Sequence, residues 1–395
     1  MVMENEYFES NCHICGGNLS HIASFSNFLQ VTSDCRPWKT GGSLVLCQSC
    51  GTVQKPVTEI YLKEAEIIYA QYEIYSQSGG VEQSAFDSIT GAAKSRSTKL
   101  VEWLTTNWNL PSTGKLLDIG CGNGAFLRAF GSTYPKWLMT GLELNDRNRE
   151  VVEAISGVQS LHVGSIESLQ DKFNVISLIH ALEHIPDPSS FLHGLKEKLL
   201  PGGILLIEVP NLRTSPFDIL IADHCTHFTS TILSKVVDRA NFSVIRLDQD
   251  YIPKELTVAI EVKNGSGFSL QPQSDDNQEY TQNTHTLLHQ HINYLQSLLD
   301  LAKSVPGNVG ILGTSIAGTW LAESLHNKVK FFLDEDPSRI GRYHLKRPII
   351  SPDAVEDGYS VLVPLPHAIA VKVAKRLSHL NCEFLLPSGL NLEVN

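Results

Sequence analysis

Four cysteines of the N-terminal region form two CxxC pairs, in the stretches CHICGG and CQSCGT. Thiolates in two such pairs are typical ligands of a tetrahedral zinc ion, and the glycine after each second cysteine allows a tight turn whose amides face the sulfurs. Free or redox-active thiols are the alternative, which the lack of a surrounding βαβ pattern disfavours. Because four sulfurs leave no open coordination position, we predict a structural zinc ion held by Cys12, Cys15, Cys47 and Cys50.

A second candidate site is the stretch KLLDIGCGNG, in which Gly120, Gly122 and Gly124 alternate with other residues and Asp118 precedes them. A turn that binds a dinucleotide prefers the spacing GxGxxG, because a pyrophosphate docks at the start of the following helix. An acidic residue just before the turn repels phosphate and suits an ammonium group. The turn therefore favours a nucleoside that carries an amino acid.

Glu143 ends the next apolar run, in GLELND, about 20 residues beyond the turn. A carboxylate at this place can accept hydrogen bonds from both hydroxyls of a ribose. One ribose, no phosphate and a charged amino acid describe S-adenosylmethionine. The alternatives are a turn that binds no ligand and a turn that binds a dinucleotide.

These residues resemble the class I S-adenosylmethionine-dependent methyltransferases over about residues 100–245, through DIGCGNG, the acidic end of the second strand and LLPGGILLIEVP. The resemblance implies that Gly120, Gly122 and the nearby backbone lie under the methionine portion of the cofactor, with Glu143 on the ribose. Ser165 stands where the family often has an aspartate at the adenine, so the backbone of Ile166 is the expected contact. His180 and Ala181 would flank the sulfonium.

Nearly the whole chain, with its cysteine pairs, its methyltransferase-like centre and a last part that begins VGILGTSIAGT, resembles the zinc-containing sugar-nucleotide C-methyltransferases. That resemblance implies a nucleotide-linked keto sugar as the methyl acceptor and a last domain that helps to hold its nucleotide. It also implies a catalytic histidine at His184 and a base at His224, next to Asp223. Ile221 replaces a family tyrosine and Asp223 replaces a glutamate, so the acceptor can differ from the usual one.

A family tyrosine before the centre corresponds to Tyr72 or Tyr75, and the sequence does not choose between them. Histidine suits the base because its pKa lies near neutral pH. Other interpretations stay open: methylation at oxygen or of a non-sugar metabolite, a non-catalytic protein that binds nucleotide sugars, a nicotinamide oxidoreductase, and a metal site formed by His180, His184, His224 and His227.

The elements that position these residues are read from the alternation of short apolar runs with helical stretches, which predicts a parallel sheet covered by helices. We expect helices over 57–76, 92–108 and 229–242, a closing antiparallel pair over 243–264, a linker over 264–284 and an amphipathic helix over 285–304. The fold class is therefore α/β, with a central Rossmann-like sheet and a second small Rossmann-like domain. The predicted parts are a zinc module (1–60), a helical connector (61–100), the cofactor domain (101–263), the linker with its helix (264–304) and a C-terminal substrate domain (305–395).

Charge and hydropathy limit the partners. The chain has 395 residues, with 31 Lys and Arg against 42 Asp and Glu, and a formal net charge of −11. Without a basic run, a nucleic-acid partner is not expected. No apolar run reaches the ~18 residues of a membrane helix, and the polar, acidic start is not typical of a signal peptide. We expect a cytoplasmic protein without a membrane partner that acts on a small molecule.

Overall fold

The computed structural model describes residues 11–82, 84–86, 93–263 and 274–387. The chain forms two compact units, each made of segments far apart in the sequence. Unit 1 contains the described residues up to Val81, the segment Leu212–Cys225 and the described residues from Ser274 onward; unit 2 contains the described residues of Glu82–Asn211 and Thr226–Gln273. The five-part division expected from the sequence stays a prediction.

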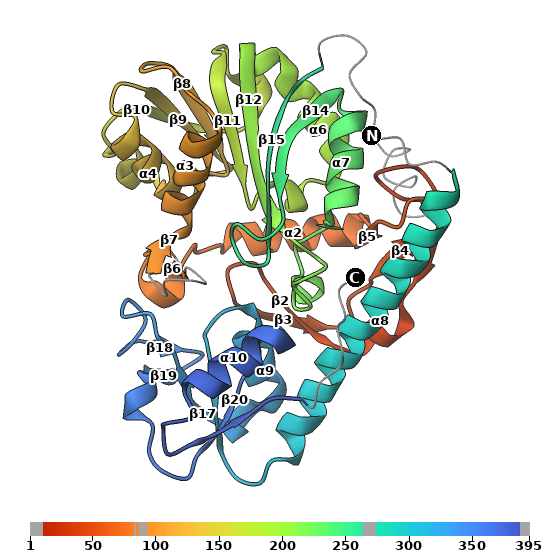
Figure 1. Cartoon of the computed structure of the whole chain (residues 1–395), viewed down its shortest axis with the longest axis vertical. Helices are drawn as coiled ribbons and strands as arrows, with labels where there is room; N and C mark the ends of the chain where they lie inside the picture. The colour runs from red at the N-terminus through yellow and green to blue at the C-terminus, as the bar shows by residue number, and fades with distance from the viewer. Residues whose placement is uncertain (1–10, 83, 87–92, 264–273, 388–395) are drawn as a thin grey trace. The chain divides into compact units, whose positions relative to one another are not determined.

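Unit 2 is built on a seven-stranded mixed sheet with the strand order β10-β9-β8-β11-β12-β15-β14 (Figure 1). The strands β8 to β12 run parallel to one another, and β14 and β15 add the antiparallel pair that the sequence predicts, with β15 also antiparallel to β12. The strands are β8 Lys115–Ile119, β9 Leu138–Glu143, β10 Val158–Val163, β11 Phe173–Ile179, β12 Leu199–Pro210, β14 Phe242–Asp248 and β15 Glu255–Val262, with the short β6 Ser84–Phe86, β7 Ala93–Ser95 and β13 Thr226–His227 outside the sheet.

The helices α3, α6 and α7 of unit 2 begin at residues whose side chains cap them. Ser95 accepts a hydrogen bond from the backbone N–H of Thr98 at the start of α3, and Thr229 accepts one at the start of α7. Apolar side chains of α3 and α4 pack in one core with β8 and β9. The helices are α3 Arg96–Asn107, α4 Ala125–Thr133, α5 Arg149–Glu153, α6 Pro188–Leu195 and α7 Ser230–Arg239, with 3-10 turns at η3 Ile166–Ser168, η4 Leu182–His184 and η5 Lys196–Lys198.

Unit 1 combines the cysteine-bearing strands, the segment Leu212–Cys225, the long helix α8 and a C-terminal α/β part around one core. The N-terminal strands are β1 Leu19–His21, β2 Leu29–Val31, β3 Pro37–Thr40, β4 Val45–Cys47 and β5 Val53–Gln54. They are followed by α2 Glu59–Ala70, which is capped by Thr58. The short turns of this region are η1 Ala23–Asn27, η2 Ser76–Ser78 and η6 Asp218–Leu220.

The C-terminal part of unit 1 has the strand order β18-β19-β17-β16-β20-β21, parallel except for the β18–β19 hairpin. This confirms a second small α/β sheet. Its elements are β16 Val309–Leu312, α9 Ile316–Leu325, η7 His326–Lys328, β17 Val329–Leu333, β18 Tyr343–His344, β19 Arg347–Ile350, η8 Pro352–Ala354, β20 Ser360–Leu362, α10 His367–Arg376 and β21 Glu383–Leu385.

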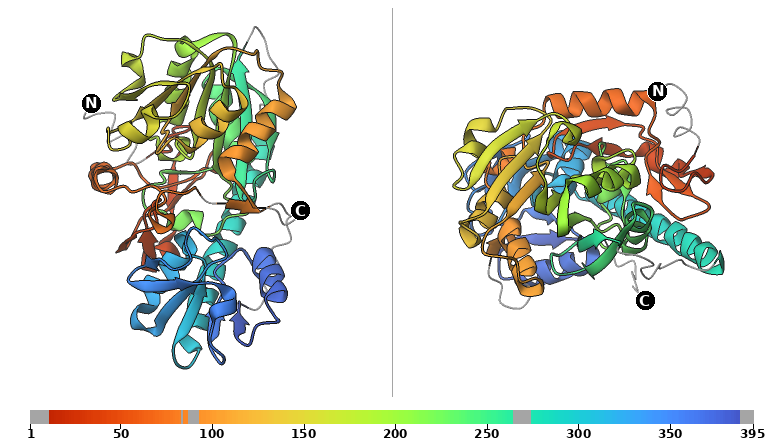
Figure 2. Two further views of the ribbon diagram at one scale, coloured as in Figure 1. Left: turned by 90° about the vertical axis from the view of Figure 1, so that its left-hand side faces the viewer. Right: turned by 90° about the horizontal axis from the view of Figure 1, so that it is seen from above.

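Two predicted segments differ from the structure. The helix α8 spans Ser274–Ser304 as one continuous rod (Figure 2), so residues 274–284 are helical and not the linker expected from their polar composition. Residues 264–273 of that predicted linker lie outside the described residues. The helix expected over 57–76 spans only Glu59–Ala70, because Gln71 leaves the helical conformation and caps it. Within the described ranges, no helix is long and apolar enough to cross a membrane.

Candidate functional site

The four cysteine sulfurs of unit 1 lie together, as the sequence predicts. Cys12 Sγ is 3.7 Å from Cys50 Sγ, and Cys15 Sγ is 3.5 Å from Cys47 Sγ. These distances match the roughly 3.8 Å edge of a tetrahedron with metal–sulfur bonds of ~2.3 Å. The backbone N–H groups of Ile14, Gly17 and Ser49 point at three of the sulfurs, each at 3.4 Å. Backbone donors stabilise thiolates, so the four cysteines fit a zinc ion.

The glycine turn of unit 2 follows β8 and has a backbone that side chains rarely permit. Gly120, Gly122 and Gly124 have φ angles of 70°, 55° and 79°. This left-handed region is accessible to glycine at no steric cost. A Cβ atom at Gly124 would lie 2.4 Å from the Ile155 side chain, so the turn also needs glycine for packing. The turn therefore leads directly from β8 into α4.

Glu143 at the end of β9 is held against this turn. Its Oε1 accepts a hydrogen bond from Gly122 N at 2.6 Å, and its Oε2 accepts one from Leu144 N at 3.1 Å. Burial raises the pKa of Glu143, and the two backbone donors act in the opposite direction. A carboxylate has about four acceptor positions, so this one keeps capacity for the two hydroxyls of a ribose. The position fits the predicted role.

Asp118 lies in the core of the sheet. Its side chain accepts a hydrogen bond from Ser177 Oγ at 2.7 Å, and the residue is 2% exposed. Burial raises the pKa of Asp118 to about 7, and the charge of Glu143 adds to the effect. A carboxyl group in this environment is close to half protonated at neutral pH, which weakens it as the partner of an ammonium group.

The other residues predicted at the cofactor also lie at the carboxyl ends of the parallel strands of unit 2. Ser165 begins the turn η3, and Ile166 is buried. His180 directly follows β11 and has a left-handed backbone with a φ angle of 50°. Its Nδ1 is 3.2 Å from Glu183 Oε1. Burial lowers the pKa of His180, but the carboxylates of Glu255, Glu183 and Glu208 outweigh burial and raise it to about 10.

His224, the predicted base, belongs to the segment Leu212–Cys225 of unit 1 and is 3% exposed. Its Nδ1 lies 2.8 Å from Asp218 Oδ1. A carboxylate at that nitrogen fixes the orientation of the ring and its tautomer, and stabilises the imidazolium when the ring takes up a proton. Asp218 comes from the turn η6, six residues earlier, and the sequence analysis did not find it. An Asp–His pair of this kind suits general base catalysis.

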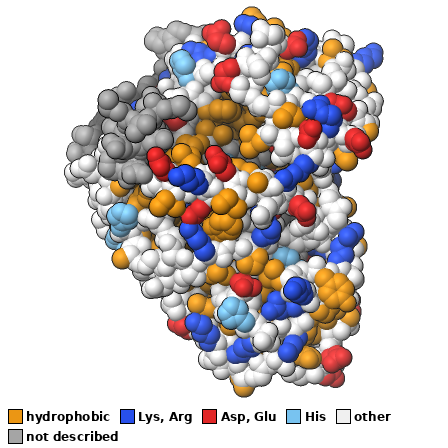
Figure 3. Space-filling model, turned by 180° about the vertical axis from the view of Figure 1, so that it is seen from behind, with side chains coloured by type: hydrophobic (Ala, Val, Ile, Leu, Met, Phe, Trp, Pro, Cys, Tyr) orange, Lys and Arg blue, Asp and Glu red, His pale blue; other side chains and the backbone are white. Residues whose placement is uncertain are grey.

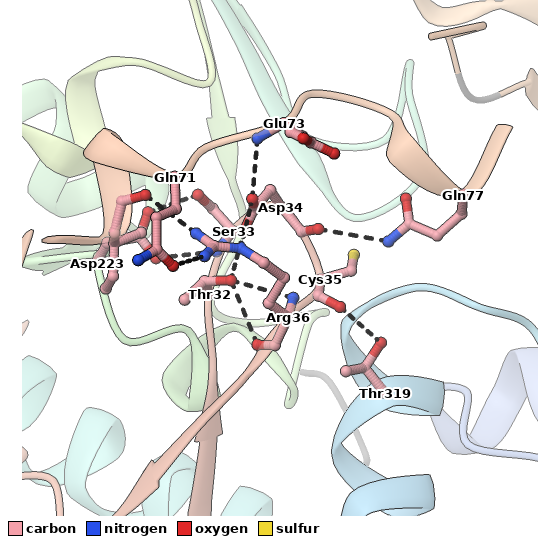
Figure 4. A network of polar contacts seen from close by, with 11 residues as sticks. Thr32, Ser33, Asp34, Cys35, Arg36, Gln71, Glu73, Gln77, Asp223 and Thr319 are labelled. Atoms are coloured by element: carbon pink, nitrogen blue, oxygen red, sulfur yellow. Dashed lines mark hydrogen bonds and ion pairs between the residues drawn. The ribbon is translucent and has the colours of Figure 1, made fainter. Parts of the chain in front are cut away.

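Asp223 is fully buried, and its carboxylate contacts Ser33. Its Oδ1 accepts a hydrogen bond from Ser33 N at 2.9 Å, and its Oδ2 accepts one from the Ser33 hydroxyl. Figure 4 shows this contact at the edge of a polar network built on the turn Thr32–Arg36, which also contacts Gln71, Glu73, Gln77 and Thr319. The network fixes the residue next to His224 to the cysteine-bearing part of the chain.

Lys55 contacts the same segment of unit 1, and Tyr72 lies near its Asp223. Lys55 Nζ donates to Gln30 Oε1 at 2.9 Å and to the carbonyl of Ile221, and burial lowers the pKa of this lysine to about 7. Burial also raises the pKa of Tyr72, and the nearby charge of Asp223 adds to it. Tyr75 has a φ angle of 55° at the start of η2. Tyr72 and Tyr75 both stay candidates for the tyrosine near the predicted base.

Part of the sequence matches a known family. Residues 92–247 match the family described as "Methyltransferase domain". The chain is 29% identical over 109 residues to a ubiquinone biosynthesis O-methyltransferase of Haemophilus ducreyi, a match that covers 25% of this chain and 45% of the relative. It is 32% identical over 105 residues to a dTDP-4-amino-2,3,4,6-tetradeoxy-D-glucose N,N-dimethyltransferase of Saccharopolyspora spinosa, covering 25% of this chain and 41% of the relative.

The part of the chain that is similar to a methyltransferase domain therefore spans most of unit 2 and the segment Leu212–Cys225 of unit 1. The chain spans less than half the length of the two curated relatives named above. A solved structure of an S-adenosylmethionine-dependent methyltransferase from Clostridium acetobutylicum is 14% identical to this chain and has a TM-score of 0.36. The match covers 52% of this chain and 100% of the other.

Unit 2 holds the predicted cofactor residues and His184, while His224, Asp223, Tyr72 and Tyr75 belong to unit 1. His224 and Asp223 nevertheless lie within the residues that match the methyltransferase domain. His184 ends the turn η4 and is half-buried. The roles of these residues stay predictions. Asp218, Glu208 and Glu255 could not be found from the sequence, because each comes from a different element and no spacing joins it to the histidine that it faces. On the face in Figure 3, acidic and basic side chains are interspersed, and neither sign forms a continuous patch there.

Proposed function

We propose that the protein is a methyltransferase that uses S-adenosylmethionine and adds a methyl group to carbon of a keto sugar nucleotide or a related carbohydrate. The observation that carries the cofactor assignment is Glu143, whose carboxylate lies against Gly122 N–H at 2.6 Å in a turn of left-handed glycines. The match to a methyltransferase domain supports it independently. When bound, S-adenosylmethionine supplies an electrophilic methyl group.

Carbon methylation needs a base that removes a proton beside a carbonyl group, so that the resulting carbanion can attack the methyl carbon while sulfur leaves with the bonding electrons. We assign this base to His224, which accepts the proton at Nε2 while Asp218 holds Nδ1 at 2.8 Å. Burial of both side chains strengthens their interaction, because little water competes with it. A positioned base contributes typically 10²- to 10⁴-fold to such a step.

We assign to His184 the role of a hydrogen-bond donor to the enolate or hydroxyl oxygen of the acceptor. A donor aimed at developing negative charge lowers the barrier of a proton abstraction. The four-cysteine cluster, if it binds zinc, is structural in this proposal, because four sulfur ligands leave no position for a substrate. The C-terminal part would hold the nucleotide of the acceptor, as the resemblance to sugar-nucleotide C-methyltransferases implies.

Methylation of oxygen or nitrogen is the second candidate. Two observations favour it: Ile221 carries no hydroxyl where the resembling family has tyrosine, and the relatives named above act on oxygen and on the amine of a nucleotide sugar. In that case His224 would deprotonate the attacking hydroxyl or amine. The two candidates differ in whether a carbon-bound proton of the acceptor is lost.

The test has two arms. First, melting temperature is measured with S-adenosylhomocysteine and with NAD; we expect stabilisation by S-adenosylhomocysteine, whereas stabilisation by NAD alone overturns the assignment. Second, dTDP-4-keto-6-deoxyglucose is incubated with the enzyme in D₂O, and exchange at carbon next to the ketone is followed by mass spectrometry. Exchange supports carbon methylation. Methyl transfer to a hydroxyl or amino analogue without exchange supports the second candidate.

Variants connect the exchange to the named residues. His224→Gln should lower the exchange rate by ~10²-fold or more, and Asp218→Asn should lower it less, since the ring stays but loses its fixed orientation. His289→Gln, an exposed histidine of α8, is the matched control and should exchange as the unchanged protein does. Equal exchange rates in His224→Gln and His289→Gln would exclude His224 as the base.

A further inference from the structure

The backbone around His224 is held by donors from the N-terminal part of unit 1. The carbonyl of Asp223 accepts a hydrogen bond from the Tyr61 hydroxyl at 3.0 Å, and the carbonyl of Cys225 accepts one from Lys55 N at 3.0 Å. Tyr61 belongs to α2, and Lys55 directly follows β5. The residues before and after the predicted base are therefore both fixed by elements that lie far away in the sequence.

The peptide group of Ile221 lies in the middle of the loop that joins Asp218 to His224. Ile221 N donates to Asp218 O at 3.0 Å, and Ile221 O accepts from His224 N at 3.4 Å. The side chains at the two ends close the loop, with His224 Nδ1 2.8 Å from Asp218 Oδ1. The Nζ of Lys55 donates to the same Ile221 carbonyl. Lys55 therefore acts on the peptide that connects the two members of the Asp–His pair.

Lys55 is a buried side chain whose nitrogen has two oxygen acceptors. The residue is 3% exposed, and besides the Ile221 carbonyl its Nζ donates to Gln30 Oε1 at 2.9 Å. Gln30 is itself buried, and a Cβ atom at Gly42 would lie 2.2 Å from its Nε2, so backbone packs closely against this amide. With its own backbone bound to Cys225, Lys55 is fixed at both ends.

The charges around Lys55 come from α2 and from the segment that it holds. The carboxylates of Asp223 and Asp218, the thiol of Cys225 and the carboxylate of Glu64 raise the pKa of Lys55, but burial outweighs them and lowers it to about 7. Charged or neutral, the amine keeps at least two N–H donors for its two acceptors. Burying an amine costs free energy that an apolar side chain would avoid, which indicates that these donors are the useful part of the residue.

We propose that Lys55 is a positioning residue of the reaction, whose Nζ fixes the Ile221 carbonyl and thereby holds the ring of His224 against Asp218. The inference rests on the proposed role of His224 as the base. A base must lie within hydrogen-bond reach of the proton that it removes. Without Nζ, the buried Ile221 carbonyl keeps the long contact with His224 N, and a poorly satisfied carbonyl favours rearrangement of the loop.

The Nδ1 proton of His224 reports on this geometry. A proton between an imidazole nitrogen and a buried carboxylate resonates far downfield in the NMR spectrum and exchanges slowly with water. Full-length protein is labelled at its histidine nitrogens, and the His224 resonance is identified by its absence in His224→Gln. We expect Lys55→Met, which keeps the length of the side chain and removes its donors, to abolish this resonance or to broaden it through faster exchange with water.

Lys63→Met is the matched control, because Lys63 is an exposed lysine of the neighbouring helix α2, and it should retain the resonance. The variants are also assayed for exchange of the carbon-bound proton of dTDP-4-keto-6-deoxyglucose in D₂O. Lys55→Met should lower the maximal exchange rate by ~10- to 10²-fold and leave KM unchanged, because a misplaced base slows the step while binding of the acceptor persists.

A His224 resonance that is the same in Lys55→Met and in the unchanged protein overturns the inference, and so does its absence from the unchanged protein. If Lys55→Met does not fold, Lys55→Leu, with a smaller apolar side chain, takes its place with the same expected and contradicting results. If the resonance changes as expected but the unchanged protein exchanges no acceptor proton, the proposed function fails, whereas the positioning of His224 by Lys55 stands.

Discussion

Two regions of the molecule share one sequence pattern: a strand, a glycine turn, a helix, and a second strand that ends at an acidic residue. In the methyltransferase domain this acid is Glu143, and in the C-terminal part of unit 1 it is Asp334. Glu143 accepts hydrogen bonds only from the backbone N–H groups of Gly122 and Leu144 among the described residues. Asp334 Oδ2, by contrast, lies 3.0 Å from Thr314 Oγ1 and 3.2 Å from Arg339 Nη1.

The two acids differ in how much of their charge and hydrogen-bonding capacity remains for a ligand. The guanidinium of Arg339 neutralises Asp334, and the threonine of its own turn occupies it further, so this acid stabilises the turn. Backbone amides hold Glu143 in place without neutralising it. The C-terminal turn is also closed by packing, because a Cβ atom at Gly318 would lie 2.1 Å from the carbonyl oxygen of Gly313. A glycine turn followed by an acid therefore indicates a fold, and the partners of the acid indicate whether a ligand binds.

Metal removal should have the largest effect on stability. It should destabilise the C-terminal turn of unit 1 and leave the glycine turn of unit 2 unchanged. Phe28, in the N-terminal part of unit 1, packs against Trp320 of α9 at a ring distance of 6.2 Å. Structural zinc contributes roughly 10 to 16 kcal/mol to the folding of small domains. We expect Cys47→Ser to remove hydrogen-exchange protection from β4, β5 and α9, and to leave the protection of β8 and β9 unchanged.

The control for this experiment is Cys382→Ser, which changes a half-buried cysteine of the same unit outside the cluster. Metal content is measured on both variants. Unchanged protection of α9 in a metal-free Cys47→Ser protein would show that the cysteine cluster does not support the C-terminal turn.

The second largest effect is the pH dependence of stability that Asp118 causes. The C-terminal turn has no such acid, because Ile311 occupies the corresponding position. The pKa of Asp118 in the folded protein is about 7 because of burial. It is raised above the unfolded value, so its contribution to stability is fully present below about pH 4 and is lost as the pH rises to about 7. Three pKa units correspond to about 4 kcal/mol.

Urea unfolding between pH 4 and pH 8, followed at β8 by hydrogen exchange, measures this loss against Asp118→Asn, which cannot ionise. We expect the unfolding free energy of the unchanged protein to fall relative to the variant as the pH rises, and to change little above pH 7. A difference that is independent of pH would mean that Asp118 is ionised throughout.

The third test substitutes Glu143 and Asp334, the acidic residues that follow the two turns. Glu143→Gln should weaken S-adenosylhomocysteine about 30-fold, because a neutral amide that also donates is a poorer partner for two ribose hydroxyls. Asp334→Asn should leave that affinity unchanged and lower the melting temperature, because Arg339 then lacks its buried counter-charge. Calorimetric titration and thermal melts on both variants make the comparison. Loss of the nucleoside in Asp334→Asn would contradict the distinction between the turns.

The sequence was most informative where neighbouring residues share one physical requirement. The two CxxC pairs, the alternating glycines and Glu143 are local patterns, and the cysteines and Glu143 lie where those patterns predict. The partner of His224 could not be predicted, because Asp218 reaches it only through the turn η6. The polar composition of residues 274–284 led to the wrong prediction of a linker. These residues belong to the helix α8, which the apolar residues further along the chain stabilise.

The smallest effect concerns packing. Gly318 lies inside α9, where alanine has the higher helix propensity by about 1 kcal/mol, yet its Cβ would meet the Gly313 carbonyl oxygen at 2.1 Å. The backbone must shift, so we expect Gly318→Ala to destabilise the protein by roughly 1 to 2 kcal/mol. Gly194 lies inside α6, and nothing comes within 4 Å of its added Cβ, so Gly194→Ala should stabilise slightly. Opposite shifts in melting temperature would show that the C-terminal turn is closed by contact between backbone atoms, whereas stabilisation by both would mean that it has room for a ligand.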